Sequence, residues 1–403
     1  MELEAAQALL VSRAQPITGR VTLPLSEALG LAAGEALYAP VDNPPFDRSP
    51  LDGFALRSED AKTAGPDHPL KFRVAASLSA GEVYARPLGQ GEALRIMTGA
   101  AMPPGADCMI PKEAVREVED GVLIFQPLKR HENYIFQGED IKQGQLLIAQ
   151  GERLGFAQLG ILAAMGLERV SVLRPCRAGV LCTGDELSPP GKPLEPGKIY
   201  DSNGVMLAAR LEELGIGARR FPSMGDDAAA ACEKIRAYIE EIDLLITTGA
   251  VSVGDKDIMP QVLHSLGAEI LVRRMNHKPG SAILCGVYRD KLILGLSGNP
   301  FAALTTLELL GRPVLARLTG RRDLECRPRE AALFNPFPGG RSAQRRFIRA
   351  RLEERDRDLP WAVLPQGHAS GQLFSLLNCN CLIDIPEGRA SLPAGSLVQV
   401  LAF

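Results

Sequence analysis

Between residues 175 and 310 the chain alternates short apolar runs with segments of helical periodicity, and this alternation restricts the fold more than any other feature. The apolar runs lie at 178–183, 218–221, 244–247, 269–273 and 292–296, and the helical segments lie at 203–214, 227–241, 258–266 and 301–310. Strands separated by helices of about 10–15 residues are typical of right-handed crossovers and a parallel, doubly wound sheet. The sequence therefore predicts an α/β domain whose loops at one end of the sheet form a single pocket.

The segment 243–257 (Asp-Leu-Leu-Ile-Thr-Thr-Gly-Ala-Val-Ser-Val-Gly-Asp-Lys-Asp) is the most informative part of this domain. Its first apolar run is too short for a helix and is bounded by Gly249, which favours a buried parallel strand. The small residues of the following loop, 248–254, allow backbone N–H groups to approach a bound anion. Helix 258–266, which ends at Gly267, directs its N-terminus toward the same place. We therefore expect a phosphate-type pocket here.

Two carboxylates, Asp255 and Asp257, follow this loop directly. Carboxylates two residues apart beside an anion pocket are better explained as Mg²⁺ ligands or as groups that orient the reacting atoms than as anion binders. The alternative is that one of them only caps the helix, which is about as frequent for an aspartate in this place. Loops 183–187 and 297–300 also follow predicted strands and contain small or acidic residues. The three loops are expected to converge.

The first part of the chain suggests one domain inserted in another. Residues 1–37 have helical spacing, and helix 156–165, closed by Gly166, is expected to return beside them. Between these lie a turn-rich segment with three prolines, 43–55, and short strands between 72 and 124, typical of a small, mostly β domain. By itself, Asp52 could be a turn former and the charged run 130–140 a solvated face.

After residue 328 the strand–helix alternation stops, and short alternating segments separated by Pro and Gly predict a small barrel or sandwich. The polar loop 366–371 is the part of it that looks most like ligand surface. We expect an α/β multidomain protein with four domains: an N-terminal helical domain (1–45 plus 140–173), an inserted mostly-β domain (46–139), a central doubly wound parallel-sheet domain (174–326) and a C-terminal small β-barrel (327–403).

Composition excludes some classes of protein. The 403 residues are 46% hydrophobic and 23% charged, with a formal net charge of −3, which provides no basic surface for nucleic acid. No apolar run approaches the roughly 20 residues that span a bilayer, and the acidic N-terminus does not resemble a signal peptide, so no membrane partner and a cytoplasmic location are expected. The eight cysteines are scattered, which indicates buried thiols; a redox or metal role for Cys379 and Cys381 is the minor alternative.

Eight short motifs, in order, together resemble the molybdopterin molybdenumtransferase family, to which bacterial MoeA and the E domain of gephyrin belong. The resemblance runs in register from about residue 2 to 403. The motifs are Ser49-Pro-Leu-Asp-Gly-Phe-Ala55, Met97-Thr-Gly-Ala100, Gly138-Glu-Asp140, Thr183-Gly-Asp-Glu-Leu187, Tyr200-Asp-Ser-Asn203, Gly249-Ala-Val-Ser-Val-Gly-Asp255, Lys278-Pro-Gly280 and Gly298-Asn-Pro300. Each motif is weak alone, and the ordered set is specific.

The resemblance implies an elongated homodimer of four-domain subunits. It implies an active site between the α/β domain of one subunit and the inserted and C-terminal domains. The implied reaction inserts molybdate into adenylylated molybdopterin with Mg²⁺, and releases AMP and molybdenum cofactor. A molybdopterin adenylyltransferase and proteins of molybdoenzyme maturation would be the protein partners.

The resemblance also assigns residues, each at a matching motif position. Catalytic positions are Asp52, Thr98, Asp140, Glu186, Asp257 and Lys278. Pterin and phosphate would be bound by Thr183, Gly184, Ser252, Val253, Gly254, Ser281, Gly298, Pro300 and Ser370, and Mg²⁺ by Glu186, Asp255 and Asp257. No histidine stands in a nucleophile–base pattern; His277, beside Lys278, is the one expected nearest the pocket.

This chain departs from the family pattern where Ser281 and Ala282 follow Lys278-Pro-Gly280, because Lys-Pro is usual there. One cation is therefore missing, which could weaken the activity, retune it to another oxyanion such as tungstate, or be compensated by Arg273, Arg274 or His277. Two other functions remain open: a non-catalytic paralogue that binds and delivers pterin or molybdenum cofactor, and an adenylyltransferase. Retained Asp52, Asp140, Glu186 and Asp257 argue against the first, and the long N-terminal and C-terminal regions against the second.

Overall fold

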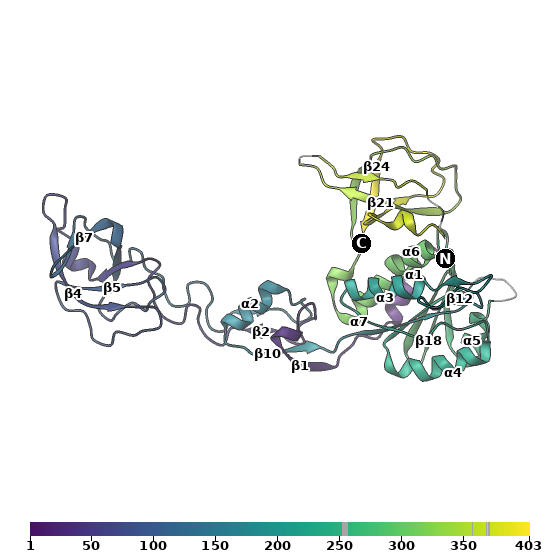
Figure 1. The fold of residues 1–403 in the computed structure, drawn as a ribbon, viewed down its shortest axis with the longest axis horizontal. Coiled ribbons are helices and arrows are strands. Elements are labelled where there is room, and N and C mark those ends of the chain that lie inside the picture. Colours follow the sequence, from purple (N-terminus) through teal and green to yellow (C-terminus); the bar gives the residue numbers. More distant parts are fainter. Residues whose placement is uncertain (252–256, 357, 368, 370) are drawn as a thin grey trace.

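The computed structural model describes residues 1–403 except 252–256, 357, 368 and 370. Figure 1 shows an elongated chain with a β domain at one end, a small domain in the middle, and an α/β domain beside a barrel at the other end. Helix α1 (Leu3–Arg13) lies with the α/β domain, far from the β domain that follows it in sequence.

The α/β domain is built on a six-stranded sheet in the order β14-β11-β15-β19-β18-β16. Its central strands are β11 (Arg177–Cys182), β15 (Leu244–Thr248) and β19 (Lys291–Leu296), which pair in parallel, with β14 (Gly217–Arg220) parallel at one edge. Every residue of β15 is buried, as the apolar run predicted.

The prediction of a fully parallel sheet is wrong at one strand. The segment β18 (Ala282–Tyr288), which the sequence analysis did not identify, pairs antiparallel with both β19 and β16 (Glu269–Arg274). A two-residue turn joins β18 to β19, and its residues Arg289 and Asp290 have φ values of 49° and 60°. Two-residue hairpins with a type I′ turn need positive φ at both turn positions, and this one uses neither Gly nor Asn.

Helices cover both faces of the sheet, and each face has its own apolar core. One core includes residues of α1, α3 (Asn203–Glu213), α6 (Pro300–Thr306) and α7 (Arg312–Thr319). The other includes residues of α4 (Ala228–Tyr238) and α5 (Met259–Leu266). The Asp227 side chain caps α4 by accepting from Ala229 N and Ala230 N, and Gly267 ends α5 in the left-handed region, as the sequence predicted.

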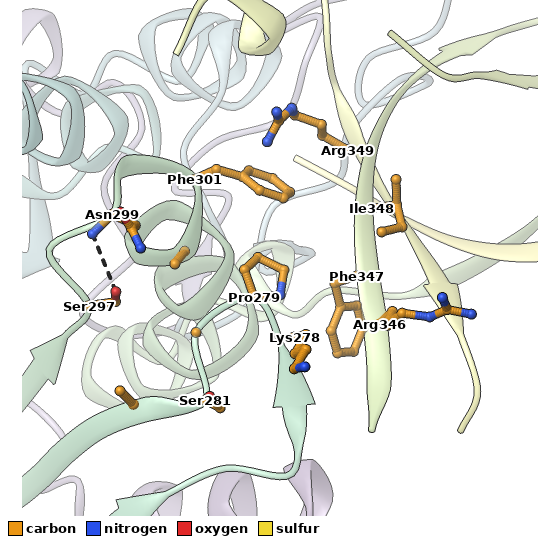
Figure 2. A pocket seen from close by; sticks show the side chains of 13 residues that line it. Lys278, Pro279, Ser281, Ser297, Asn299, Phe301, Arg346, Phe347, Ile348 and Arg349 are labelled. Carbon is orange, nitrogen blue, oxygen red and sulfur yellow. Dashed lines mark hydrogen bonds between the residues drawn. The ribbon is translucent and has the colours of Figure 1, made fainter. Parts of the chain in front are cut away.

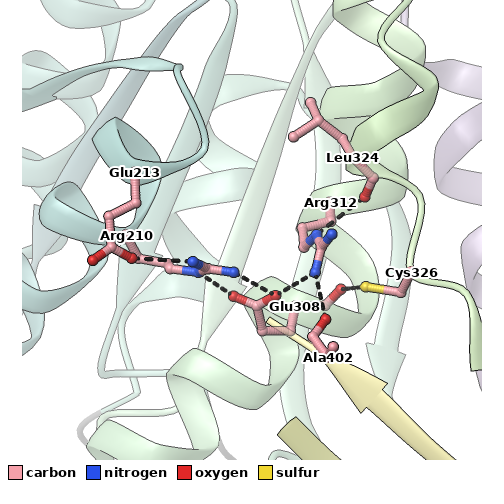
Figure 3. Close-up of polar contacts among 7 residues, drawn as sticks. All are labelled: Arg210, Glu213, Glu308, Arg312, Leu324, Cys326 and Ala402. Atoms are coloured by element: carbon pink, nitrogen blue, oxygen red, sulfur yellow. Dashed lines mark hydrogen bonds and ion pairs between the residues drawn. The ribbon is translucent and has the colours of Figure 1, made fainter. Parts of the chain in front are cut away.

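A buried ionic network joins the α/β domain to the C-terminal domain (Figure 3). Glu308, in the π-helical turn Leu307–Gly311 between α6 and α7, is 2% exposed and accepts from Arg210 Nε at 2.7 Å and Arg312 Nη1 at 3.1 Å. Arg312 also donates to the carbonyls of Leu324 and Ala402 at 3.0 Å each. Through Arg312, the carboxylate of Glu308 thus anchors both the connection between the two domains, at Leu324, and the last strand, at Ala402.

The small middle domain is formed by two separate segments of the chain. Strand β1 (Arg20–Pro24) pairs antiparallel with β10 (Arg169–Leu173), and β2 (Leu37–Tyr38) with β9 (Leu146–Ile148). The expected helix is α2 (Phe156–Ala164). The expectation of helical spacing to residue 37 is wrong beyond Arg13, because α1 ends there and residues 14–38 hold strands and a three-residue 3-10 turn, Leu25–Glu27.

The inserted domain has a six-stranded sheet in the order β6-β3-β5-β4-β8-β7. Its strands are β3 (Gly53–Leu56), β4 (Leu70–Leu78), β5 (Glu92–Ile96), β6 (Cys108–Pro111), β7 (Val115–Val118) and β8 (Gly121–Ile124). The mostly-β character predicted for this region is confirmed.

The C-terminal domain is a closed barrel. Its strands are β20 (Pro328–Leu333), β21 (Arg345–Glu353), β22 (Trp361–Val363), β23 (Cys381–Ile385) and β24 (Leu397–Ala402). They pair in the order β21-β22-β20-β24-β23, and β23 pairs with β21 to close the ring. The two-residue strand β17 (His277–Lys278) of the α/β domain pairs in parallel with β21, so backbone pairing connects the two domains.

Candidate functional site

The carboxyl ends of three parallel strands lie level with one another. Cys182 pairs with Thr248, and Thr248 pairs with Leu296, so the loops after β11, β15 and β19 leave the sheet at the same height. Thr183 N donates to Thr248 O at 2.8 Å, and Gly249 N donates to Leu296 O at 3.2 Å. The predicted convergence of the three loops is confirmed by these bonds.

Small residues make this close approach possible. At Gly249, where φ is 90°, a Cβ atom would lie 2.3 Å from Thr183 O, which no side chain tolerates. Gly298 lies against Gly249 as well, since a Cβ there would be 3.6 Å from the Gly249 Cα. Asn203 Nδ2 donates to Gly298 O at 2.7 Å, and Asn203 Oδ1 is buried without a hydrogen-bond partner in the described part of the chain.

Glu186 lies at the rim of this edge. Its side chain folds back over Gly184, where a Cβ would be 2.5 Å from Glu186 Oε2. Glu186 is exposed, and no hydrogen bond or ion pair to its carboxylate is found among the described residues. A carboxylate with unused oxygen atoms suits a hard cation such as Mg²⁺.

Asp257 lies just before α5 and is half-buried. Its predicted neighbours Ser252, Val253, Gly254 and Asp255 lie outside the described residues, as does Ser370 of the barrel. Within the described residues there is no group of three or more His, Cys, Asp or Glu side chains able to hold a metal ion. The assignment of Mg²⁺ to Glu186, Asp255 and Asp257 therefore stays a prediction.

A cavity of about 420 Å³ lies between the α/β domain and the barrel (Figure 2). One wall is formed by the turn after β17, by Ser297 and Asn299 of the loop after β19, and by Phe301 and Ala302 of α6. The other wall is formed by residues 346–349 of β21. Lys278 and Ser281, both predicted site residues, line it together. Pro300 lies between lining residues, at the start of α6.

Arg349 is a fully buried cation at this cavity. Its exposed fraction is 0%, its guanidinium stacks 4.2 Å from the Phe301 ring centroid, and Nη2 donates to Ala369 O at 3.0 Å. Nε and Nη1 are buried without partners among the described residues. Burial lowers the pKa of Arg349, because desolvation disfavours the charged form. A buried guanidinium with unused donors is suited to binding an anion.

Lys278 adds a second cation. Its side chain is exposed toward the cavity, and among the residues that the structure describes no hydrogen bond or ion pair reaches its ammonium group. Arg346 also borders the cavity, but its guanidinium is bound within the barrel, where Nη1 donates to Gly340 O and Nη2 to Arg389 O, both at 2.8 Å. Among the described lining residues, Lys278 and Arg349 therefore keep the most unused donors, while Arg346 keeps only Nε.

The sequence analysis did not identify Arg349. It lies in β21, in one of the short alternating segments that predicted a barrel or sandwich. The available signal was that Phe347 and Arg349 alternate with Arg346 and Ile348, so that an arginine shares a strand face with a large aromatic residue. Arg273 and Arg274, considered as replacements for the missing lysine, do not line the cavity.

The inserted domain brings Asp52 and Thr98 together. Asp52 Oδ1 accepts from Thr98 N at 2.8 Å and from Thr98 Oγ1 at 2.7 Å, and Lys112 Nζ lies 3.7 Å from Oδ2. The bond from the Thr98 amide, followed by that from its hydroxyl, lowers the pKa of Asp52, so this carboxylate is ionised at neutral pH. Asp140 is exposed, and its Oδ2 accepts from Asn43 Nδ2 at 2.9 Å.

Within one chain these acidic residues do not face the cavity. Figure 1 shows the inserted domain and the α/β domain at opposite ends of the molecule, with the domain of β1, β10 and α2 between them. A compartment that includes Asp52, Asp140 and Lys278 would therefore need a second copy of the chain.

Comparisons with known family models match most of the chain. Residues 1–166 match the model of the MoeA N-terminal region (domains I and II), 179–317 a probable molybdopterin binding domain, and 340–403 the MoeA C-terminal region (domain IV).

Curated relatives and a solved structure are similar to the chain over nearly its full length. The molybdopterin molybdenumtransferase of Staphylococcus aureus (strain COL) is 33% identical over 94% of this chain and 90% of its own length. The homologue in Staphylococcus epidermidis (strain ATCC 12228) is 35% identical over the same shares. The molybdopterin biosynthesis MoeA protein of Pyrococcus horikosii superposes with a TM-score of 0.85 at 34% identity, covering 100% of this chain and 98% of its own. The chain belongs to the molybdopterin molybdenumtransferase family.

Proposed function

We propose that this protein inserts molybdate into adenylylated molybdopterin, and releases AMP and molybdenum cofactor. The observation that carries the proposal is the interdomain cavity, which presents Lys278 and the buried Arg349 and has no carboxylate among its described lining residues. A cavity of about 420 Å³ with two cations suits a phosphorylated ligand or a tetrahedral oxyanion.

Cleavage of a phosphoanhydride depends mainly on positioning and on stabilisation of charge, without a protein nucleophile. We assign Lys278 and Arg349 to hold the anionic group between the domains, with Ser281 donating a hydrogen bond. Thr183, Gly184, Gly298 and Pro300, from the converging loops, would border the pterin and its phosphate, with Ser252, Val253, Gly254 and Ser370 completing the pocket.

Mg²⁺ would be held by Glu186, Asp255 and Asp257, where it would neutralise charge on the phosphate oxygens. The carboxylate of Glu186, which has no hydrogen-bond partner among the described residues and lies at the edge where the three loops meet, supports this assignment. The protein's own carboxylates would orient the phosphoanhydride relative to the attacking group.

Asp52 of the inserted domain, and Asp140 in the connection next to it, would act from a second subunit. Asp52, fixed by Thr98, and Asp140 would face the cavity of the partner in a homodimer, because their own α/β domain lies too far away along the molecule. In the described residues no helix is long and apolar enough to cross a membrane. We further propose a cytoplasmic location, with a molybdopterin adenylyltransferase and molybdoenzyme maturation proteins as partners.

The test is AMP release from adenylylated molybdopterin, measured with molybdate and separately with tungstate. We expect oxyanion-dependent release by the wild type, and loss of release in Asp257→Ala and Asp140→Ala without loss of the dimer. Binding without release by the wild type would instead support a carrier, ATP-dependent adenylylation of molybdopterin would support an adenylyltransferase, and wild-type rates from both variants would reject the site assignment.

A further inference from the structure

His277 lies between the two walls of the interdomain cavity without lining it. It is 1% exposed and begins β17, which pairs with β21 at Arg345. Its ring meets Phe347 edge to face, with centroids 5.5 Å apart and planes at 87°. Phe347 and the adjacent Lys278 both line the cavity. The buried ring of His277 therefore contacts strand β21, which carries Arg349. In the chain, His277 directly precedes Lys278, which lies on the opposite wall of the cavity.

The hydrogen bonding of His277 defines its protonation. Nδ1 lies 2.9 Å from Pro279 O, and a carbonyl oxygen only accepts, so Nδ1 carries a proton and donates it. Burial lowers the pKa of His277 to about 4, so at neutral pH the ring is uncharged. Nε2 then has no proton, and it is buried without a partner in the described residues.

The turn 278–281, which follows His277, has little room to move on the side that faces α6. At Gly280, where φ is 89°, a Cβ would lie 2.4 Å from Thr306 Oγ1, 3.2 Å from Ala302 O and 3.5 Å from His277 Cε1. Met275 N donates to Ser281 O at 2.9 Å, which closes the turn at its far end. The backbone of 278–281 is therefore fixed by α6, by Met275 and by the ring of His277, while the Lys278 side chain extends toward the cavity.

We propose that His277 is a positioning residue for anion binding. Its neutral ring, through the bond from Nδ1 to the Pro279 carbonyl, sets the turn so that the Lys278 ammonium and the Arg349 guanidinium hold the same anionic group. The identity of that group rests on the proposed function; the positioning does not.

The charges around the ring agree with a neutral donor. The charges that act on the ring are Arg345 of β21, bound by Asp384 and Glu4, and Glu2, whose carboxylate accepts from Asn276 Nδ2 at 2.8 Å. A protonated ring would place one more positive charge between Lys278 and Arg345. A neutral ring fixes the turn without competing with Lys278 for the anion.

The first experiment measures binding of inorganic molybdate to the full-length protein by titration calorimetry. Asn can place an amide donor close to the position of Nδ1, whereas Gln reaches the position of Nε2 and Leu donates nothing. We expect His277→Asn to bind within about threefold of wild type, and His277→Gln and His277→Leu to bind roughly tenfold more weakly, as for one lost hydrogen bond. His264→Asn, on the exposed face of α5, is the matched control.

The second experiment needs no substitution that could impair folding. Nitrogen-15 NMR of the wild-type imidazole rings should show one histidine in the Nδ1–H tautomer that stays neutral at pH 6. The absence of such a ring, with every histidine either in the Nε2–H tautomer or charged at pH 6, would overturn the proposal, as would molybdate affinity in a folded His277→Leu equal to that of the wild type. If affinities follow the expected order but the wild type releases no AMP, the proposed function fails and the role of His277 stands.

Discussion

At the scale of single residues, Arg349 is the group on which anion binding depends most. It is fully buried and stacks on Phe301, and among the described residues its hydrogen bonds go to carbonyl oxygens. Burial of a cation without a counter-ion costs free energy, which a bound anion would return. Such a residue is better explained by ligand binding than by stability of the fold.

Replacement of Arg349 should therefore separate function from stability. Arg349→Met retains the apolar contact with Phe301 and removes the charge. We expect the melting temperature to stay the same or rise, and molybdate affinity to fall roughly 10- to 100-fold, as for a lost charge-assisted bond. Calorimetry and a thermal melt give both values, with Arg317→Met on the exposed face of α7 as the control. Full affinity in the Arg349 variant would show that the anion binds elsewhere.

His277 should make the protein sensitive to mild acid. Its pKa is about 4 in the fold, lowered by burial from 6.5, so the unfolded chain takes up a proton first as the pH falls. The stabilisation is complete above about pH 6.5 and is lost progressively below it. We expect the unfolding free energy to drop by about 2 kcal/mol between pH 7 and 5.

This loss can be followed in urea by the fluorescence of Trp361, the single tryptophan, which lies in the barrel. His277→Leu should remove most of the pH dependence, and His264→Gln should retain it. An unchanged pH dependence in His277→Leu would assign the acid sensitivity to other groups.

At the scale of elements, the sequence correctly predicted strands and helices whose ends are marked by particular residues. Strand β15 and helix α5 were found because an apolar run ends at Gly249 and a helical pattern ends at Gly267. Strand β18 was missed because the turn after it, Arg289-Asp290, contains neither the Gly nor the Asn that usually marks a two-residue hairpin. The burial of Arg349 comes from packing of the barrel on α6, a tertiary effect that strand periodicity does not encode.

The prediction at the scale of elements concerns the π-helical turn Leu307–Gly311. Glu308 balances Arg210 and Arg312, and Arg312 holds carbonyls of the interdomain connection and of β24 (Figure 3). Removal of the central charge would leave Arg312 buried without its carboxylate partner, and would leave the half-buried Arg210 with the exposed Glu213 as its carboxylate partner among the described residues. Glu308→Gln should therefore lower the free energy of unfolding by about 3–5 kcal/mol.

The measurement is urea unfolding followed by Trp361, with Glu213→Gln as the control, since Glu213 is an exposed partner of Arg210. A change below about 1 kcal/mol in Glu308→Gln, the range of surface ion pairs, would mean that the network does not hold the domains together.

At the scale of the whole molecule, the chain separates its acidic and cationic residues. Asp52, next to β3, lies in the inserted domain at one end, and Asp140 lies in the connection between that domain and the middle domain, whereas Lys278 of β17 and Arg349 of β21 lie at the other end. The motifs could be recognised from the sequence, but their separation could not, because it depends on how the middle domain of β1, β10 and α2 spaces the two ends.

A mixed dimer tests whether the two ends meet across subunits. Asp140→Ala and Lys278→Met should each be inactive alone as homodimers. In a purified heterodimer, one composite site contains both substitutions and the other contains neither, so AMP release should return to roughly half of the wild-type rate. A heterodimer with no activity would place Asp140 and Lys278 in a site formed within one chain.

The location of the oxyanion itself is the most direct test of the central claim. Crystals of the protein soaked in molybdate, with diffraction recorded at the molybdenum absorption edge, would show the metal by its anomalous scattering. The account predicts a molybdenum peak in the cavity between the α/β domain and the barrel, within hydrogen-bonding reach of Lys278 and Arg349 through its oxygens. A molybdenum peak at any other place, with this cavity empty of it, would contradict the account.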